Sequence, residues 1–193
     1  TFEGTFVHLK NDNVVSRGFD DKIGTFVVTE LLTRIDPKKI NCALFSVATV
    51  QEEIGLRGAR TSSYRLDPDI GIAVDIGFSS DFPEGEKKSI GDIQLGKGPM
   101  LSRGANINQK LGNMLEETAQ KNKIPFQVTA APRATGTDAN AMQVNRQGVA
   151  TALISIPTRY GHTPVELLCL EDVENAIKLL KCFLESLKPG EDY

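Results

Sequence analysis

Few features that mark specialised protein classes occur in this chain of 193 residues. Its three cysteines are an odd number without regular spacing, which argues against a disulfide-stapled secreted module and favours a reducing, cytoplasmic location. No apolar run approaches the roughly 18 residues that cross a membrane. The first residues also lack the basic region followed by an apolar region that would mark a secretion signal. We therefore expect no membrane partner.

The charge balance argues against another class. The sequence has 22 Lys and Arg residues against 25 Asp and Glu residues, a net charge of -3, and no basic stripe. Nucleic-acid binding needs a concentrated positive field, so we expect no nucleic-acid partner. The Walker pattern, a Gly-x-Gly-x-x-Gly run after a strand and a Gly-x-Ser-x-Gly elbow are also absent from the sequence. Phosphate cradling and serine-nucleophile catalysis are therefore disfavoured.

What is present is an ordinary globular composition, with 40% hydrophobic residues that can bury one core. Apolar residues recur at helical spacing, and short β-branched runs indicate strands. The predicted helices cover 21–35, 107–118 and 173–187, and the predicted strands cover 5–9, 14–15, 42–50, 70–76, 90–95, 125–129 and 149–156. Strands that alternate with helices predict an α/β fold, a three-layer sandwich with a mostly parallel central sheet.

Acidic residues follow two of the predicted strands, at the carboxyl ends where such sheets bind ligands. Glu52 and Glu53 are adjacent, so one carboxylate could hold a metal while the other faces water or substrate; a solvated acidic pair is the alternative. Asp75 interrupts an apolar strand near its end. Because an unpaired buried carboxylate is costly, a cation is its simplest partner, and an exposed strand-end Asp is the alternative.

Further candidate ligands lie at both ends of the chain. Asp20 and Asp21 precede the first helix, where an N-cap would also place an Asp. His162 lies in a loop after strand 149–156, although a loop histidine can also be an incidental surface residue. Together with the acids above, it completes a donor set suited to Zn²⁺, Co²⁺ or Mn²⁺. The other histidine, His8, lies within a strand pattern and is assigned to packing or to the surface.

Residues 136–139, Gly-Thr-Asp-Ala, precede a predicted short helix. Thr137 and Asp138 could cap this helix or orient a substrate, and Asp138 could also support a metal ligand. Arg133 and Arg159 could attract acidic substrates, but a surface or packing role is the better interpretation of both.

Five ordered motifs together resemble the catalytic domain of a dinuclear metallo-aminopeptidase family. This family contains the glutamyl aminopeptidases, the TET aminopeptidases and proteins once labelled cellulase M. The motifs are Gly18-Phe-Asp-Asp-Lys-Ile-Gly24, Val50-Gln-Glu-Glu-Ile-Gly-Leu-Arg-Gly-Ala59, Ala73-Val-Asp-Ile-Gly77, Gly136-Thr-Asp-Ala139 and Ile156-Pro-Thr-Arg-Tyr-Gly-His-Thr-Pro-Val-Glu166.

The resemblance implies a hydrolase that releases N-terminal residues from peptides with the help of two divalent metal ions, zinc or cobalt. It implies that Asp20 bridges the two ions, that Glu53 and His162 complete one site, and that Asp75 contributes to the other. Glu52 is then the general base that takes a proton from the attacking water.

Family members also carry an earlier segment that this sequence lacks. That segment supplies the first strands and a Gly-His-x-Asp motif whose histidine completes the second metal site, and an inserted β domain follows it. We therefore expect an N-terminally truncated single catalytic domain over residues 1–193 with one metal site incomplete. Residues 1–16 would be strands returning from the insertion. In related enzymes a cis peptide follows the bridging Asp, so the resemblance also implies one between Asp20 and Asp21.

Two alternatives to an aminopeptidase remain open. The missing histidine would suit a non-catalytic assembly or interaction subunit, or an inactive fragment, because a half-built centre cannot clamp both reacting groups. A related metal-dependent deacylase or carboxypeptidase would use the same chemistry on different substrates. The expected partners are peptide substrates and further copies of the chain in a homo-oligomer.

Overall fold

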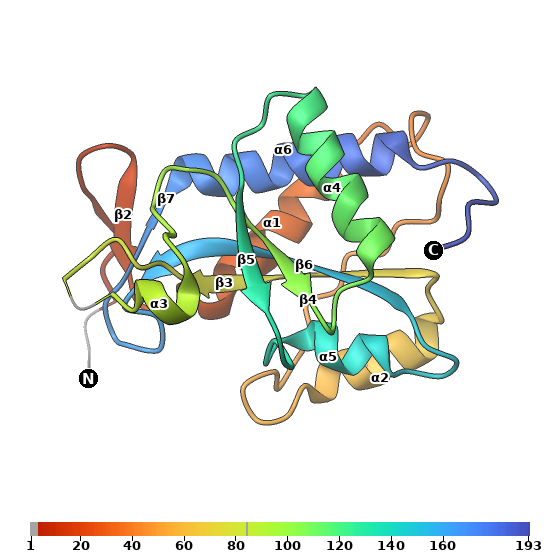
Figure 1. Cartoon of the computed structure of the whole chain (residues 1–193), viewed down its shortest axis with the longest axis horizontal. Helices are drawn as coiled ribbons and strands as arrows, with labels where there is room; N and C mark the ends of the chain where they lie inside the picture. The colour runs from red at the N-terminus through yellow and green to blue at the C-terminus, as the bar shows by residue number, and fades with distance from the viewer. Residues whose placement is uncertain (1–3, 84) are drawn as a thin grey trace.

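The computed structural model describes residues 4–83 and 85–193, in which one mixed sheet separates two layers of helices (Figure 1). Three helices cover one face of the sheet: α1 (Phe19–Arg34), α4 (Gln109–Lys121) and α6 (Leu170–Ser186). On the other face are α2 (Arg57–Leu66) and α5 (Asp138–Gln143). The remaining described helix, the short α3 (Lys87–Ile90), lies beyond the end of β3 (Ile70–Phe78). The predicted α/β class and three-layer arrangement are confirmed.

Within these described ranges seven strands form the sheet, in the order β1-β2-β7-β6-β4-β5, with β3 paired to β6. Besides β3, they are β1 (Val7–His8), β2 (Asn13–Ser16), β4 (Met100–Gly104), β5 (Gln127–Ala131), β6 (Ala150–Arg159) and β7 (Glu166–Cys169). The two longest pairings, β3 with β6 and β4 with β5, are parallel. The four shorter pairings are antiparallel, so the sheet is mixed.

The main core lies between the sheet and helices α1, α4 and α6. The apolar stripe predicted for residues 173–187 is buried along its whole length, which confirms α6 as an amphipathic helix. Strand β6 is buried over most of its residues because helices cover both of its faces. A smaller cluster beneath α5 contains Ala73, Ile107, Ala139 and Leu153.

Most elements predicted from apolar spacing are confirmed, with small shifts. Helices 21–35 and 107–118 correspond to α1 and α4, and strands 70–76 and 149–156 correspond to β3 and β6. The predicted strands 5–9 and 14–15 form the hairpin of β1 and β2. Residues 1–3, part of the predicted returning segment, lie outside the described residues. Strand 125–129 corresponds to β5, which alternates between half-buried and exposed residues because it forms the edge of the sheet.

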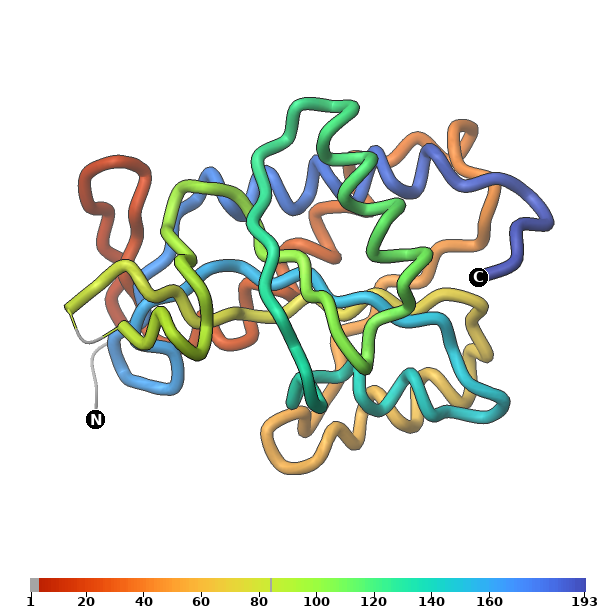
Figure 2. Tube along the Cα trace, in the orientation of Figure 1, coloured from red at the N-terminus to blue at the C-terminus, as the bar shows by residue number. Residues whose placement is uncertain are grey.

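The prediction of a central strand over residues 42–50 is wrong. This segment has no strand pairing within the described residues, and its apolar side chains Phe45, Val47 and Val50 are exposed. Figure 2 follows it as the orange trace between α1 and α2. A strand needs a neighbour to pair its backbone groups. Strand β3 pairs with β6 alone, so no described strand lies between β3 and this segment.

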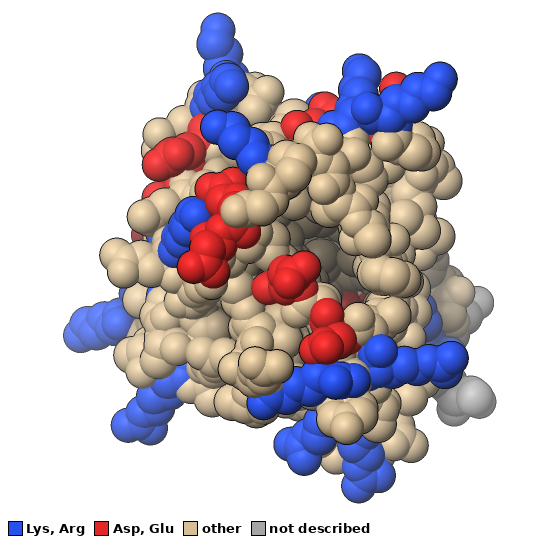
Figure 3. Space-filling model, turned by 90° about the vertical axis from the view of Figure 1, so that its right-hand side faces the viewer, with Lys and Arg blue, Asp and Glu red and all other residues tan. Residues whose placement is uncertain are grey.

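A cleft of about 910 Å³ occupies the space between this segment and β3. Residues 41–49, 51–53 and 70–75 line it, together with parts of α1, α6 and the C-terminal residues. The molecule is hollowed near the centre of the face shown in Figure 3. The apolar pattern of residues 42–50 is typical of a strand that is covered on both faces. In the structure, however, one side of this segment faces an open cleft.

The sequence also predicts a short strand over residues 90–95, and this prediction is wrong. The chain there forms α3 and a loop in which Gly91, Gly96 and Gly98 have positive φ angles. Such angles are incompatible with an extended strand, which needs negative φ. Helix α2 and strands β4 and β7 were not predicted; for example, α2 has few apolar residues at helical spacing.

An ion pair fastens the end of β6 to the loop after β3. Arg159 donates two hydrogen bonds to the carboxylate of Asp81, at 2.9 and 2.7 Å, and the backbone N–H of Leu95 donates a third at 3.0 Å. The packing role predicted for Arg159 is thus confirmed. Arg133 is exposed, as a surface role predicts.

We predict that Asp81→Asn lowers the free energy of unfolding by about 1–3 kcal/mol near neutral pH, since it breaks this half-buried pair. Burial alone would raise the pKa of Asp81, but Arg159 and the Leu95 N–H outweigh it and hold that pKa below its ordinary value. The stabilisation is therefore present above about pH 4 and is lost as the pH falls through the folded-state pKa. Urea unfolding at pH 6 and pH 3 measures it. An equal difference between Asp81→Asn and the unmodified chain at both pH values would contradict the prediction.

No helix in the described ranges is long and apolar enough to cross a membrane.

Candidate metal centre

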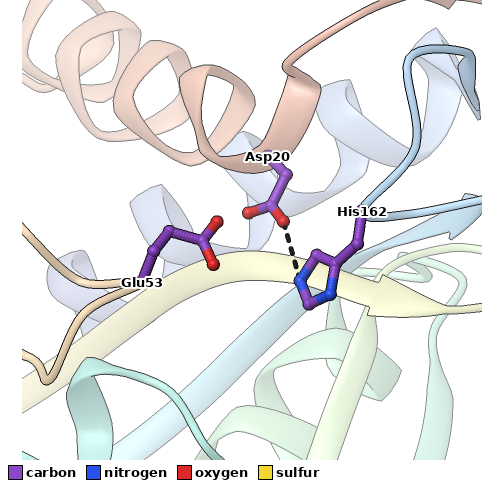
Figure 4. A group of neighbouring side chains, drawn as sticks. All are labelled: Asp20, Glu53 and His162. Carbon is purple, nitrogen blue, oxygen red and sulfur yellow. Dashed lines mark ion pairs between the residues drawn. The ribbon is translucent and has the colours of Figure 1, made fainter.

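Three of the predicted ligands converge at one edge of the sheet (Figure 4). Asp20 comes from the start of α1, Glu53 from the turn before α2, and His162 from the loop after β6. Each offers one ligand atom, and these atoms all lie within 4.8 Å of one another. The imidazole Nε2 of His162 is 3.0 Å from Oδ2 of Asp20. Carboxylate and imidazole donors at this spacing are a set that divalent transition metals and zinc accept.

The local backbone aims Asp20 away from the helix that follows it. Helix α1 starts after Gly18, whose φ of 67° lies in the left-handed region. Asp20 and Asp21 have non-helical backbone angles, and the peptide bond between them is cis, as the resemblance implies. The N-cap alternative does not apply to Asp20. Asp21 instead accepts a hydrogen bond from the backbone N–H of Gly24 at 2.9 Å, within the first turn of the helix.

The adjacent residues Glu52 and Glu53 differ in environment, as expected for neighbours in a turn. The Glu52 carbonyl accepts hydrogen bonds from the N–H groups of Gly55 and Leu56, at 3.0 and 2.9 Å, which fixes the turn. Glu53 is exposed and belongs to the three-residue group, whereas Glu52 is half-buried beside it. Burial raises the pKa of Glu52, and the charges of Asp138 and Glu53 raise it further. A carboxylate with a raised pKa beside a group of candidate metal ligands has the properties of a general base.

Asp75 lies outside the three-residue group, although it is close enough to sense its charges. Its Oδ1 accepts the N–H of Ile76 at 2.7 Å. Burial raises the pKa of Asp75 to about 7, against the effect of that hydrogen bond and with help from Glu52. Burial also raises the pKa of Asp21 to about 8, with the Asp75 charge adding to it. Two half-buried carboxylates side by side repel each other when both are ionised. The pair is therefore stabilised either by a bound proton or by a bound cation.

Asp138 connects the centre to the segment that precedes Glu52. The hydroxyl of Thr49 donates a hydrogen bond to Oδ2 of Asp138 at 2.5 Å, while Oδ1 is buried without a partner among the described residues. Burial raises the pKa of Asp138. Thr137 holds the N-cap position of α5, but its side chain makes no capping hydrogen bond and instead pairs with the hydroxyl of Thr135. The geometry thus favours a supporting role for Asp138 over a capping role for Thr137.

The packing or surface role predicted for His8 is confirmed, since it is exposed on β1 and its ring centroid lies 5.1 Å from that of Phe6. Glu166 was not predicted as a site residue. It is 2% exposed, and its Oε2 accepts the backbone N–H of Asp20 at 3.2 Å. The available signal was weak: an acid that opens the short apolar run Glu166-Leu-Leu-Cys169.

Comparison with known proteins agrees with this fold. The family model described as M42 glutamyl aminopeptidase matches residues 1–179. The lysyl aminopeptidase of Pyrococcus furiosus is 46% identical over 188 residues, which cover 97% of this chain and 53% of the relative. An aminopeptidase structure from the archaeon Desulfurococcus kamchatkensis aligns with a TM-score of 0.89 at 36% identity, covering 97% of this chain and 53% of the other.

The TET1 peptidase of Pyrococcus horikoshii, which can assemble into a tetrahedron or a large octahedral shell, aligns with a TM-score of 0.83 at 29% identity. The alignment covers 96% of this chain and 54% of that one. The chain belongs to the M42 family of peptidases, that of the glutamyl aminopeptidases. It spans about half the length of the relatives it matches.

Proposed function

We propose that this chain is the catalytic part of a metal-dependent aminopeptidase. The observation that carries the proposal is the meeting of Asp20, Glu53 and His162 from three distant parts of the sequence, with Glu52 beside them. The names of the relatives support the reaction class. The proposal assigns Asp20, Glu53 and His162 to one divalent ion, zinc or cobalt. A second ion would lie between Asp20 and Asp75, where the donor set is incomplete.

A divalent ion held by these residues supplies Lewis-acid polarisation of the scissile carbonyl and acidifies water. Proton transfer and positioning are assigned to side chains of this chain. Glu52 accepts a proton from the attacking water and passes it to the departing amine, a role for which its half-buried position and raised pKa suit it. Asp138 holds Thr49 and so restrains the segment that leads into Glu52. This positioning supports reaction geometry without direct contact with the bond that breaks.

The test is hydrolysis of lysyl- and glutamyl-p-nitroanilide, the amino acids named in the relatives, by the chain supplied with Co²⁺ or Zn²⁺. We expect turnover with either metal, loss of turnover in EDTA, and recovery when the metal is restored. The N-acetylated substrates should not react, because an aminopeptidase requires a free α-amine. Release of acetate from the blocked substrates without release of p-nitroaniline would instead identify a deacylase, and release of C-terminal residues from free peptides would identify a carboxypeptidase.

A second candidate function, a non-catalytic assembly subunit or a part completed by further polypeptide, is favoured by the open cleft beside β3. Phe45 and Val47 line this cleft and are exposed, which is unusual for an apolar β-branched run. Binding of Co²⁺ without turnover on any of these substrates would support this candidate over the aminopeptidase. We also propose a homo-oligomer with peptide substrates as partners, from the assembly of the TET relative. The cytoplasmic location and the single domain over residues 1–193 stay predictions.

A further inference from the structure

Glu166 is a buried acid to which the reaction above gives no role. It is the first residue of β7, paired with Ser16 at the end of β2, and only 2% of it is exposed. None of the ion pairs among the described residues involves it. Burying an acid without a cationic partner costs free energy, so the contacts of Glu166 need a physical explanation.

Among the residues that the structure describes, one hydrogen bond reaches this carboxylate, and it comes from the metal centre. Its Oε2 accepts the backbone N–H of Asp20, across 146 residues of sequence. Asp20 and Asp21 have non-helical backbone angles at the kinked start of α1, so the Asp20 N–H lies outside the regular ladder of helical hydrogen bonds. Glu166 supplies the acceptor for this N–H, and the residue that it fixes is the candidate ligand Asp20.

The same loop also carries a second ligand. His162 lies four residues before Glu166, in the turn between β6 and β7, and its Nε2 faces the Asp20 carboxylate at 3.0 Å. Glu166 thus holds the backbone of one ligand from the base of the loop that supplies another. The carboxylate also brings a buried acidic group next to the centre, because its Oε2 lies 3.2 Å from the backbone nitrogen of Asp20.

We propose that Glu166 is a positioning residue of the metal centre, which orients Asp20 toward His162 and adds negative charge that favours a bound cation. This inference rests on the proposed metal site. It assigns Glu166 two separable contributions: a hydrogen-bond acceptor for the Asp20 N–H, and a buried charge. Residues that orient metal ligands in this way typically change metal affinity by about 10–100-fold when removed.

Co²⁺ titration, followed by the visible absorption of the bound ion, tests the proposal without any need for turnover. We expect Glu166→Ala to weaken Co²⁺ binding about 10–100-fold and to change the shape of the absorption band. Glu166→Gln keeps an acceptor oxygen but loses the charge, so it should recover part of the affinity and the band shape of the unmodified chain. His162→Ala serves as the positive control for loss of a ligand.

A matched control separates positioning from general destabilisation. Asp172 is also a fully buried carboxylate that accepts backbone N–H groups, from Gly96 and Gly98 at 2.7 Å, but it lies outside the metal centre. Asp172→Asn should leave Co²⁺ affinity within about twofold. Unchanged Co²⁺ affinity in Glu166→Ala overturns the role of Glu166 but not the proposed metal site. An equal loss of Co²⁺ affinity in Asp172→Asn has the same consequence. Failure of the unmodified chain to bind Co²⁺ overturns the proposed metal site, and this inference with it.

Discussion

Glu52→Gln is expected to lower the rate of p-nitroanilide hydrolysis by about 10²–10⁴-fold while Co²⁺ affinity changes little. Gln has nearly the shape of Glu but cannot take up the proton of the attacking water. Glu52 lies outside the three-residue group of Asp20, Glu53 and His162, so the donor set stays intact. Steady-state kinetics at saturating metal, together with a Co²⁺ titration of the same sample, measure both quantities.

The matched control is the neighbouring substitution Glu53→Gln, which makes the same chemical change one residue further along. It should weaken Co²⁺ binding strongly, because Glu53 supplies one of the three converging ligand atoms. The two variants together separate the base from the ligand. Equal turnover by the unmodified chain and Glu52→Gln would remove the catalytic assignment of Glu52, and the aminopeptidase proposal for this chain would fail with it.

Ile154→Ala is expected to lower the free energy of unfolding by about 2–5 kcal/mol, a large fraction of the stability of a typical domain. Ile154 is fully buried in β6, between the parallel partner β3 and the antiparallel partner β4. Helices cover both faces of β6, so its neighbours can collapse only partly into the space that the smaller side chain leaves. Equilibrium unfolding in urea, followed by circular dichroism, measures the change.

Ile54→Ala provides the control, since it makes the same substitution at a position that is 59% exposed. Its effect on the free energy of unfolding should stay within about 0.5 kcal/mol. A loss at Ile154 no larger than that at Ile54 would mean that β6 is not the packed centre of the domain.

Much of the fold followed from local sequence patterns. The stripe of Val173, Ile177 and Leu180 predicted α6, and Pro37 correctly predicted that α1 ends before it. These patterns succeed because a helix closes its own backbone hydrogen bonds, so only its apolar face depends on the rest of the chain. The order of acidic motifs was also sufficient to indicate the family, which the match over residues 1–179 confirms.

Strands were predicted less well, because their hydrogen bonds depend on a neighbour. Residues 42–50 have the composition of a central strand, yet they pair with no strand in the described part of the chain. The short strands β4 and β7 gave too weak a pattern to predict. Apolar composition indicates what a segment would bury, but only the tertiary structure decides whether a partner is present to pair with its backbone.

The sequence by itself determined which residue types were available for a metal centre and that they follow the ends of predicted strands. Only the tertiary structure decided that Asp20, Glu53 and His162 meet within 4.8 Å, that Asp75 lies outside this group, and that Glu166 holds the backbone of Asp20. These relations join residues separated by up to 146 positions. No local pattern specifies them, because they depend on how β6, β7 and α1 pack together around the edge of one sheet.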